Sequence, residues 1–200
     1  KSVVYVSKSK FRLIQILRGT ILAVEMCFAH YLFLKIGLIE AHAIFASCPL
    51  IVAALSVFFL KEKVGWRRWT AIFIGFIGIL IILRPGSKVF DPLSLVALGC
   101  AIAFVIYQIL TRYVSSEDSP DTSLFYTGLT GFVLLGAVGP FFYTAIDSMH
   151  LIWLLIVCIL GAGGHYLMIN AFKHSEASIL QPFTYLQLVF VSIIGVLIFD

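Results

Sequence analysis

The amino-acid sequence predicts an all-α polytopic membrane protein with seven transmembrane helices. Hydrophobic residues make up 61% of the 200-residue chain and charged residues only 12%, whereas a soluble domain has about 45–50% and about 25%. The apolar residues gather in seven runs, each close to the about 20 residues that a bilayer-crossing helix needs. The runs are uniformly apolar, which excludes the alternating strands of a membrane barrel.

The seven predicted spans are joined by short connections. These connections carry charged residues, serine, proline or glycine, which interrupt an apolar helix; they include residues 61–63, 84–86, 115–121, 147–148 and 173–176. The predicted spans, in chain order, are residues 13–34, 41–60, 66–83, 93–111, 123–146, 150–172 and 177–199. The cysteines and histidines show no CxxC, HxxxH or HExxH spacing, so we expect free thiols and no metal site.

The distribution of lysine and arginine predicts a cytoplasmic N-terminus for this chain. Cytoplasmic segments of membrane proteins carry an excess of these residues. With that orientation the cytoplasmic segments hold ten of them and the opposite segments only three. We therefore attribute the net charge of +4 to membrane topology and expect no nucleic-acid partner. The ten are Lys1, Lys8, Lys10, Arg12, Lys61, Lys63, Arg67, Arg68, Arg112 and Lys173.

An internal repeat is visible. Residues 30–41 (HYLFLKIGLIEA) resemble residues 165–177 (HYLMINAFKHSEA) with one residue inserted, and each copy precedes a span that contains a proline. The copies belong to the first and sixth predicted spans, an offset of five. Because five is odd, the two copies insert in opposite directions. Inverted repeats are typical of secondary transporters, in which the substrate lies between the halves near the membrane midplane.

One face of the first span is polar. Gln15, Arg18, Leu22 and Glu25 recur at helical spacing. Arg18 and Glu25 are two turns apart, roughly 10.5 Å of helical rise, which is too far for a direct ion pair. Each therefore needs a partner on another helix, in water or on a substrate: Glu25 could carry a proton, and Arg18 could hold an anionic group. The alternative for Arg18 is that its side chain extends to the cytoplasmic headgroups.

Two spans contain a proline, Pro49 in the second and Pro182 in the last. Proline has no N–H, so the carbonyls of Phe45 and Ser178 lose their helical partners. Within a helix bundle such carbonyls can line a cavity, and matched helix breaks in two halves point to a binding site. The alternative is a packing kink without ligand contact.

Other polar residues inside the spans complete the predicted substrate pathway. Each of these polar residues could instead be an interhelical hydrogen-bond partner. The glycine pair Gly75 and Gly78 is expected to allow close helix approach. The full set of predicted pathway or coupling residues is Arg18, Glu25, His42, Pro49, Tyr107, Gln108, His165, Asn170, Gln181, Pro182 and Tyr185.

The motifs of the main catalytic alternatives are missing from the sequence. A rhomboid-like protease needs a GxSxG-type serine with a histidine partner, a zinc protease needs HExxH, and an ATP-driven pump needs GxxxxGK[ST]. None of the three occurs. We therefore predict no catalytic residues and no cofactor, and we disfavour an intramembrane enzyme.

The order and spacing of several motifs resemble the EamA-type family of the drug/metabolite transporter superfamily over nearly the whole chain. No single motif is diagnostic. They are Arg18-Gly19, residues 38–44 (LIEAHAI), Pro49-Leu50, residues 60–69 (LKEKVGWRRW), 75–78 (GFIG) and 84–86 (RPG), Ala177-Ser178 and residues 181–187 (QPFTYLQ).

This resemblance implies ten helices in two inverted five-helix repeats. On that pattern the chain matches helices 3 to 9: residues 1–85 hold three helices of the first repeat, and residues 86–200 hold four of the second. We therefore expect a partial reading frame. The implied function is a permease for a small organic metabolite or drug in the bacterial inner membrane, working by alternating access, with proton coupling as an option. The alternative is a truncated, non-transporting membrane protein or scaffold. The expected partners are the lipid bilayer and a small-molecule substrate, and a homodimer is a further option.

Overall fold

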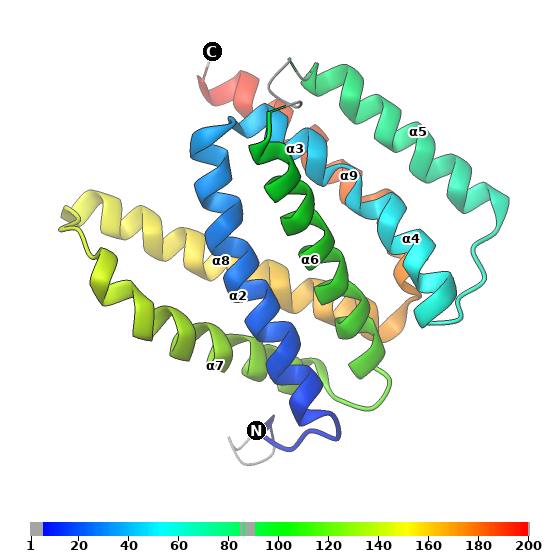
Figure 1. Cartoon of the computed structure of the whole chain (residues 1–200), viewed down its shortest axis with the longest axis horizontal. Coiled ribbons are helices and arrows are strands. Elements are labelled where there is room, and N and C mark those ends of the chain that lie inside the picture. The colour runs from blue at the N-terminus through cyan, green and yellow to red at the C-terminus, as the bar shows by residue number, and fades with distance from the viewer. Residues whose placement is uncertain (1–5, 85, 87–90, 200) are drawn as a thin grey trace. The chain divides into compact units, whose positions relative to one another are not determined.

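The computed structural model describes residues 6–84, 86 and 91–199, which form helices joined by short connections (Figure 1). Among the described residues, five helical segments are long and apolar enough to cross a membrane: Arg12–Lys35, Glu40–Phe59, Leu93–Val114, Pro120–Phe142 and Ser148–His174. The predicted all-helical polytopic fold class is thereby confirmed. In chain order the helices are α2 (Arg12–Lys35), α3 (Leu38–Phe45), α4 (Cys48–Phe59), α5 (Trp66–Leu83), α6 (Leu93–Val114), α7 (Pro120–Val138), the 3₁₀ helix η2 (Gly139–Phe142), α8 (Ser148–His174) and α9 (Ala177–Phe199).

The second predicted span, residues 41–60, divides into two helices, α3 and α4. The sequence predicted a break at Pro49 within one span. The Ser47 hydroxyl donates to the Ile44 carbonyl at 2.6 Å, which competes with regular helical hydrogen bonding. The Ser47 carbonyl then accepts the backbone N–H groups of Leu50 and Ile51 at 3.1 and 3.2 Å. Pro49 falls in the first turn of α4, where the missing N–H carries no penalty. Proline therefore starts a new helix here instead of kinking an existing one.

The limits of α7 also differ from the prediction. The helix begins at Pro120 instead of residue 123 because the Ser119 side chain accepts the Thr122 N–H at 3.1 Å and caps the helix. It ends at Val138, and η2 carries the helical path only to Phe142, short of the predicted residue 146. Pro140 stands in the first turn of η2 and has no N–H to extend the α-helical ladder.

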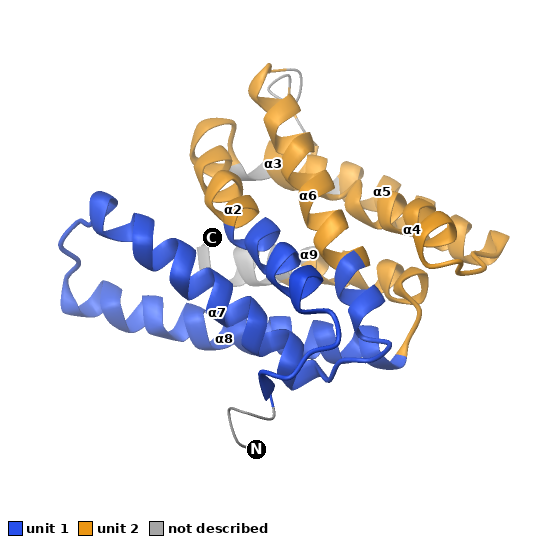
Figure 2. Cartoon of the chain, turned by 60° about the horizontal axis from the view of Figure 1, so that its bottom comes forward, with its two compact units in different colours: residues 1–23, 110–174 blue, residues 24–109, 175–200 orange. Residues whose placement is uncertain are grey.

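The chain forms two compact units (Figure 2). Unit 1 comprises residues 1–23 and 110–174, and unit 2 comprises residues 24–109 and 175–200. Each unit combines segments from before and after residue 85, and helices α2 and α6 supply residues to both.

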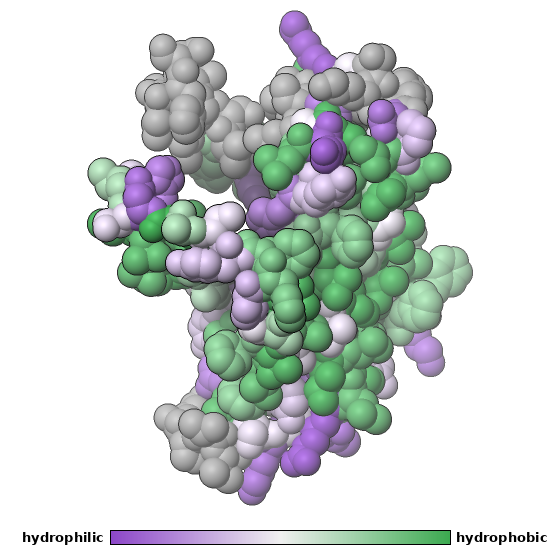
Figure 3. Space-filling view, turned by 60° about the vertical axis from the view of Figure 1, so that its left-hand side comes forward, coloured by the Kyte–Doolittle hydropathy of each residue, from purple (hydrophilic) through white to green (hydrophobic). Residues whose placement is uncertain are grey.

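Unit 1 contains the start of α2, the end of α6, and all of α7, η2 and α8. Helix α7 packs against α8. Helix α2 comes so close to α7 that a Cβ on Gly19 would collide with the Thr130 side chain. Most of α8 is exposed, including Leu155 at 61% and Leu167 at 67%. On the face drawn in Figure 3, apolar side chains form most of the visible surface, as expected for helices that meet lipid.

Unit 2 is built around α9, which packs against α4 and α5. Gly75 of α5 permits this contact, since a Cβ there would collide with the ring of Tyr185, whereas Gly78 has open space around it. The predicted close approach is thus found at Gly75 and not at Gly78. The core cluster consists of Ala46, Ala53, Ile72, Ile79 and Tyr185, and a second cluster of Leu32, Ile36, Ala41, Ala97 and Cys100.

Candidate functional site

The predicted polar face of the first span is buried, as its helical spacing indicated. Gln15 and Arg18 are 0% exposed, Leu22 is 4% exposed and Glu25 is 6% exposed. Gln15 and Arg18 belong to unit 1 and Glu25 to unit 2. The face is therefore one continuous stripe of α2 whose polar groups have different surroundings.

Arg18 is the centre of a hydrogen-bond network in unit 1. Its Nε donates to Gln15 Oε1 at 2.6 Å, one Nη donates to Thr111 Oγ1 at 3.1 Å, and the other Nη donates to the Ser123 carbonyl. The guanidinium thus joins α2 to the end of α6 and the start of α7. The Arg18 side chain is fully buried. This differs from the alternative interpretation, in which the side chain extends to the cytoplasmic headgroups.

Asp118 extends this network and was not singled out by the sequence, where it falls in a charged connection. Its carboxylate accepts hydrogen bonds from Gln15 Nε2 at 2.8 Å, the Ser9 hydroxyl at 2.5 Å and the Lys10 backbone N–H at 3.0 Å. The Gln15 amide also donates to Ser123 Oγ at 3.0 Å. Asp118 and Gln15 together tie the segment before α2 to the start of α7. The arrangement stabilises unit 1 and offers no open polar group.

Glu25 lies in unit 2 and makes no hydrogen bond or ion pair with another residue in the described part of the chain. Its carboxyl group is close enough to the Cys48 and Cys100 thiols to interact with them electrostatically. Both thiols are buried, and Cys48 Sγ donates to the Ala101 carbonyl at 3.6 Å. A buried carboxyl group in an apolar span without a basic partner is unfavourable for folding and typical of a functional position.

Helix α9 forms a hydrogen bond to the chain between α3 and α4. Tyr185 donates its hydroxyl to the Ala46 carbonyl at 3.1 Å, and its side chain is 6% exposed. The acceptor is the carbonyl of the residue after Phe45, whereas the sequence predicted that Pro49 frees the carbonyl of Phe45 itself. The two proline-containing segments thus meet at a hydrogen bond in unit 2, and Pro49 is buried at the start of α4.

Gln108 of α6 and Gln181 of α9 face each other in unit 2. The Gln181 amide nitrogen lies 3.5 Å from Gln108 Oε1 and donates to the Ala177 carbonyl at 3.0 Å. The side chains are 4% and 1% exposed. Gln181 Oε1 has no hydrogen-bond partner among the described residues. A buried amide oxygen that lacks a partner destabilises the fold by about 1–3 kcal/mol, so it requires an explanation.

The other predicted pathway residues are dispersed. His42 stacks on Phe33 with ring centroids 5.1 Å apart, and Tyr107 is fully buried and stacks on Phe104. His165 and Asn170 are half-buried in unit 1, and Pro182 is half-buried in unit 2. The structure thus brings together Gln108 with Gln181, while Arg18, His165 and Asn170 belong to unit 1.

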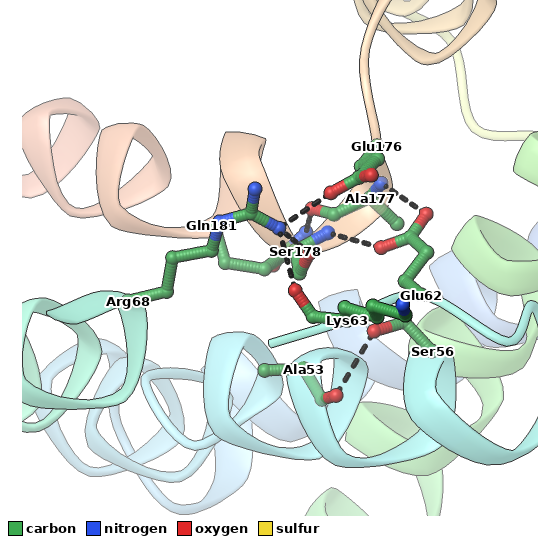
Figure 4. Close-up of polar contacts among 9 residues, drawn as sticks. All are labelled: Ala53, Ser56, Glu62, Lys63, Arg68, Glu176, Ala177, Ser178 and Gln181. Atoms are coloured by element: carbon green, nitrogen blue, oxygen red, sulfur yellow. Dashed lines mark hydrogen bonds and ion pairs between the residues drawn. The ribbon is translucent and has the colours of Figure 1, made fainter. Parts of the chain in front are cut away.

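A polar cluster at the start of α9 was missed by the sequence analysis, which treated its charges as topology signals and helix ends. Glu62 accepts the backbone N–H groups of Ala177 at 2.7 Å and Ser178 at 3.0 Å (Figure 4). Arg68 pairs with Glu176 at 2.5 Å and donates to Ser178 Oγ at 3.0 Å. The motif LKEKVGWRRW supplied a signal, since Glu62 and Arg68 stand in it, but their partners lie more than 100 residues away in sequence.

The described residues contain no group of three or more histidine, cysteine, aspartate or glutamate side chains that could hold a metal ion. The candidate site therefore consists of polar side chains buried between apolar helices. Two of its groups, the Glu25 carboxyl group and Gln181 Oε1, make no hydrogen bond with another described residue. Such groups suit the reversible binding of a small polar molecule.

Comparison with known proteins shows extensive similarity to transporters. The EamA-like transporter family matches residues 3–84 and 92–200. The chain is 31% identical to the S-adenosylmethionine uptake transporter of Rickettsia bellii over 99% of this chain and 69% of that protein. It is 28% identical to the S-adenosylmethionine uptake transporter of Rickettsia felis, with 94% of this chain and 64% of that protein covered.

A riboflavin transporter of Vibrio cholerae is 34% identical over 78% of this chain and 53% of that protein. The chain thus spans between 53% and 69% of the length of these relatives. No solved structure matches it. Because the family match covers nearly the whole of the chain's length, this chain belongs to the EamA-like transporter family.

Proposed function

We propose that this chain is a secondary transporter of a small organic metabolite that works by alternating access between two inverted repeats, residues 1–85 and 86–200. The observation that carries the proposal is the set of polar side chains buried in unit 2, above all Glu25, Gln108 and Gln181. Apolar helices retain such groups at a cost of about 2.5–3.5 kcal/mol for a charge at the helix centre. A substrate that binds to these side chains and is then released would account for their presence. The names of the relatives support metabolites of the S-adenosylmethionine or riboflavin kind.

Glu25 is the proposed coupling group. It has no basic partner among the described residues, and the Cys48 and Cys100 thiols near it are both buried. A carboxyl group in such surroundings can take up and release a proton during a transport cycle. Arg18, by contrast, is fully engaged in unit 1, which supports a role in holding that unit together.

Uptake by proteoliposomes tests this function. Purified chain is reconstituted, and labelled S-adenosylmethionine, riboflavin and an amino-acid panel are supplied with and without an imposed pH gradient. We expect saturable uptake of at least one solute, driven by the gradient in wild type and insensitive to it in Glu25→Gln. Glu117→Gln is the matched control, because Glu117 is exposed and pairs with Lys10 on the surface. Uptake that matches empty liposomes for every solute contradicts the proposed function, and an unchanged gradient response in Glu25→Gln contradicts the coupling role.

The proposed setting is the bacterial inner membrane, with the start of this segment in the cytoplasm. The excess of positive charge in alternate connections supports this orientation. It is tested by single cysteines at exposed positions in a cysteine-free background, Lys8→Cys and Asp147→Cys. A membrane-impermeant maleimide added to intact cells is expected to label residue 147 and not residue 8. The reverse pattern overturns the orientation.

Cross-linking of the same variants across a range of protein densities tests a homodimer.

A further inference from the structure

The orientation of the two amides in the Gln108–Gln181 pair follows from their surroundings. The Gln181 group 3.0 Å from the Ala177 carbonyl must be the NH₂, because two oxygens would repel each other there. This NH₂ faces Gln108 Oε1. Among the described residues, the buried Gln181 Oε1 accepts no hydrogen bond. Gln108 accepts through its Oε1, which leaves its NH₂ available as a donor. The pair thus presents one acceptor and one donor.

Pro182 adds a second acceptor in the same turn of α9. It follows Gln181 directly and has no N–H, so the Ser178 carbonyl receives no helical hydrogen bond from position 182. The open groups therefore lie on a helix whose backbone is itself interrupted. In membrane proteins such interruptions are tolerated where the backbone is buried in the protein or lines a water-filled cavity.

The chemistry of this pair selects an uncharged, hydrogen-bonding portion of a ligand. Neither amide carries charge, so the pair gives no particular stabilisation to a phosphate or carboxylate. Arg68, which contacts the start of α9, is already paired with Glu176. A hydrocarbon would leave the buried Gln181 Oε1 unsatisfied, which is unfavourable. An adjacent donor and acceptor on a planar ring satisfies both amide groups, as when a glutamine side chain binds the edge of adenine.

We propose that the Gln108–Gln181 amide pair binds the hydrogen-bonding edge of a planar nitrogen heterocycle in the transported metabolite. The inference rests on the proposed transport function and names the substrate class of that site. It agrees with the one chemical feature common to the substrates named for the relatives: S-adenosylmethionine carries adenine and riboflavin carries isoalloxazine. Both rings place an N–H donor beside a nitrogen or carbonyl acceptor.

Competition binding to the purified full chain in nanodiscs tests this inference separately from transport. Labelled S-adenosylmethionine and labelled riboflavin serve as probes, and each is challenged with a heterocyclic and a non-heterocyclic part of itself. We expect adenosine or lumiflavin to displace the bound probe, and methionine or ribitol to leave it bound. Equal displacement by the non-heterocyclic parts, or no binding of either probe or of either heterocycle to folded protein, overturns the proposal.

Variants of the pair separate recognition from folding. Gln181→Met has a similar volume and no amide, and we expect it to weaken probe binding roughly tenfold or more, the equivalent of one lost good hydrogen bond. We expect its thermal stability to stay close to that of wild type, because the variant removes the unpartnered Gln181 Oε1 together with the NH₂ that donates to the Ala177 carbonyl. Gln108→Met is expected to act in the same direction. Gln187→Met is the control, since Gln187 lies on α9 and is exposed.

The outcomes for binding and transport are distinguishable. Binding that depends on Gln181 without any flux in proteoliposomes supports the site and contradicts the transport function. Flux of a solute that neither adenosine nor lumiflavin inhibits supports transport and overturns the heterocycle site. Wild-type affinity in Gln181→Met overturns the site whatever the flux.

Discussion

The carboxylate of Glu62, in the connection between α4 and α5, accepts the backbone N–H of Ala177, the first residue of α9, at 2.7 Å. A second hydrogen bond, from the Ser178 N–H at 3.0 Å, makes Glu62 a cap supplied from a different part of the chain. The first N–H groups of a helix lack partners within the helix, and the helix dipole favours negative charge at this end. Glu62 satisfies both demands, and it is 8% exposed.

We predict that Glu62→Gln lowers the free energy of unfolding by about 1–2 kcal/mol, because it keeps one acceptor and removes the charge. The measurement is thermal unfolding in detergent, followed by labelling of the buried Cys48 and Cys100 thiols after the exposed Cys27 and Cys158 are changed to serine. Glu117→Gln, at an exposed glutamate, is the control. Identical unfolding of Glu62→Gln and this control contradicts the capping role.

The ion pair between Arg68 and Glu176 is predicted to contribute little to the stability of the fold. Their side chains are 32% and 39% exposed, and ion pairs at such positions contribute about 0.5–1 kcal/mol. A double-mutant cycle with Arg68→Met and Glu176→Gln in the thiol assay measures this coupling. We expect it to shrink as salt is raised, because ions screen exposed charges. A coupling energy near zero at low salt argues against a stabilising pair.

Arg18→Lys is predicted to destabilise unit 1 by about 2–3 kcal/mol. Lysine places a single compact ammonium where the guanidinium spans Gln15, Thr111 and the Ser123 carbonyl, so buried acceptors lose their donors. Arg12→Lys, at an exposed arginine of the same helix, is expected to change stability by less than about 0.5 kcal/mol. Titration with sodium dodecyl sulfate provides the unfolding free energies. Equal stability of the two variants contradicts the buried network.

The glycines of α5 provide a matched pair of substitutions. Gly75→Ala places a methyl group against the Tyr185 ring and is predicted to destabilise by about 1–3 kcal/mol through overpacking. Gly78→Ala enters open space and is predicted to be neutral or stabilising by up to about 1 kcal/mol, since alanine favours helix. Thermal unfolding of the two variants side by side tests the α5–α9 contact. The opposite ranking would show that Tyr185 does not pack there.

Asp147, before α8 and outside the spans, carries a pH prediction. The His150 backbone N–H donates to its Oδ1 at 2.8 Å and the His150 ring nitrogen lies at 2.5 Å. These hydrogen bonds lower the pKa of Asp147 below its ordinary value. Because the folded-state pKa is depressed, the stabilisation is present above the unfolded pKa and is lost as pH falls through the folded pKa.

Carboxyl-carbon NMR of selectively labelled protein checks this prediction. We expect the Asp147 midpoint below that of an aspartate in an unstructured peptide. His150→Ala should raise the midpoint only partly, because the backbone donor is retained. A midpoint at or above the peptide value contradicts the cap.

Helices such as α6 and α8 could be predicted from the sequence because a bilayer requires long apolar segments. The predicted runs 93–111 and 150–172 fall within Leu93–Val114 and Ser148–His174. The division at Ser47 could not be predicted, because it depends on a serine side chain that bonds back to Ile44 instead of on loss of apolar character. Pro49 indicated an interruption in the right place. Its outcome, two helices instead of one kinked helix, depends on packing that one sequence does not reveal.

Burial of the polar face was predictable for the same periodic reason, and Gln15, Arg18 and Glu25 are all buried. The partners were not predictable: Thr111 and Ser123 lie 93 and 105 residues from Arg18. Arg68 was counted among the charges that set orientation, and Glu62 was placed in a charged connection. Nothing local distinguishes a cap for a distant helix from a solvated loop charge.

The central claim, that this chain is a carrier of a heterocyclic metabolite, is tested most directly by counterflow. Proteoliposomes are preloaded with unlabelled S-adenosylmethionine or riboflavin, diluted, and supplied with a trace of the same labelled solute. A carrier predicts transient accumulation of label above its equilibrium level, which adenosine or lumiflavin suppresses. Label that never exceeds equilibrium, or that enters empty liposomes equally, contradicts the account.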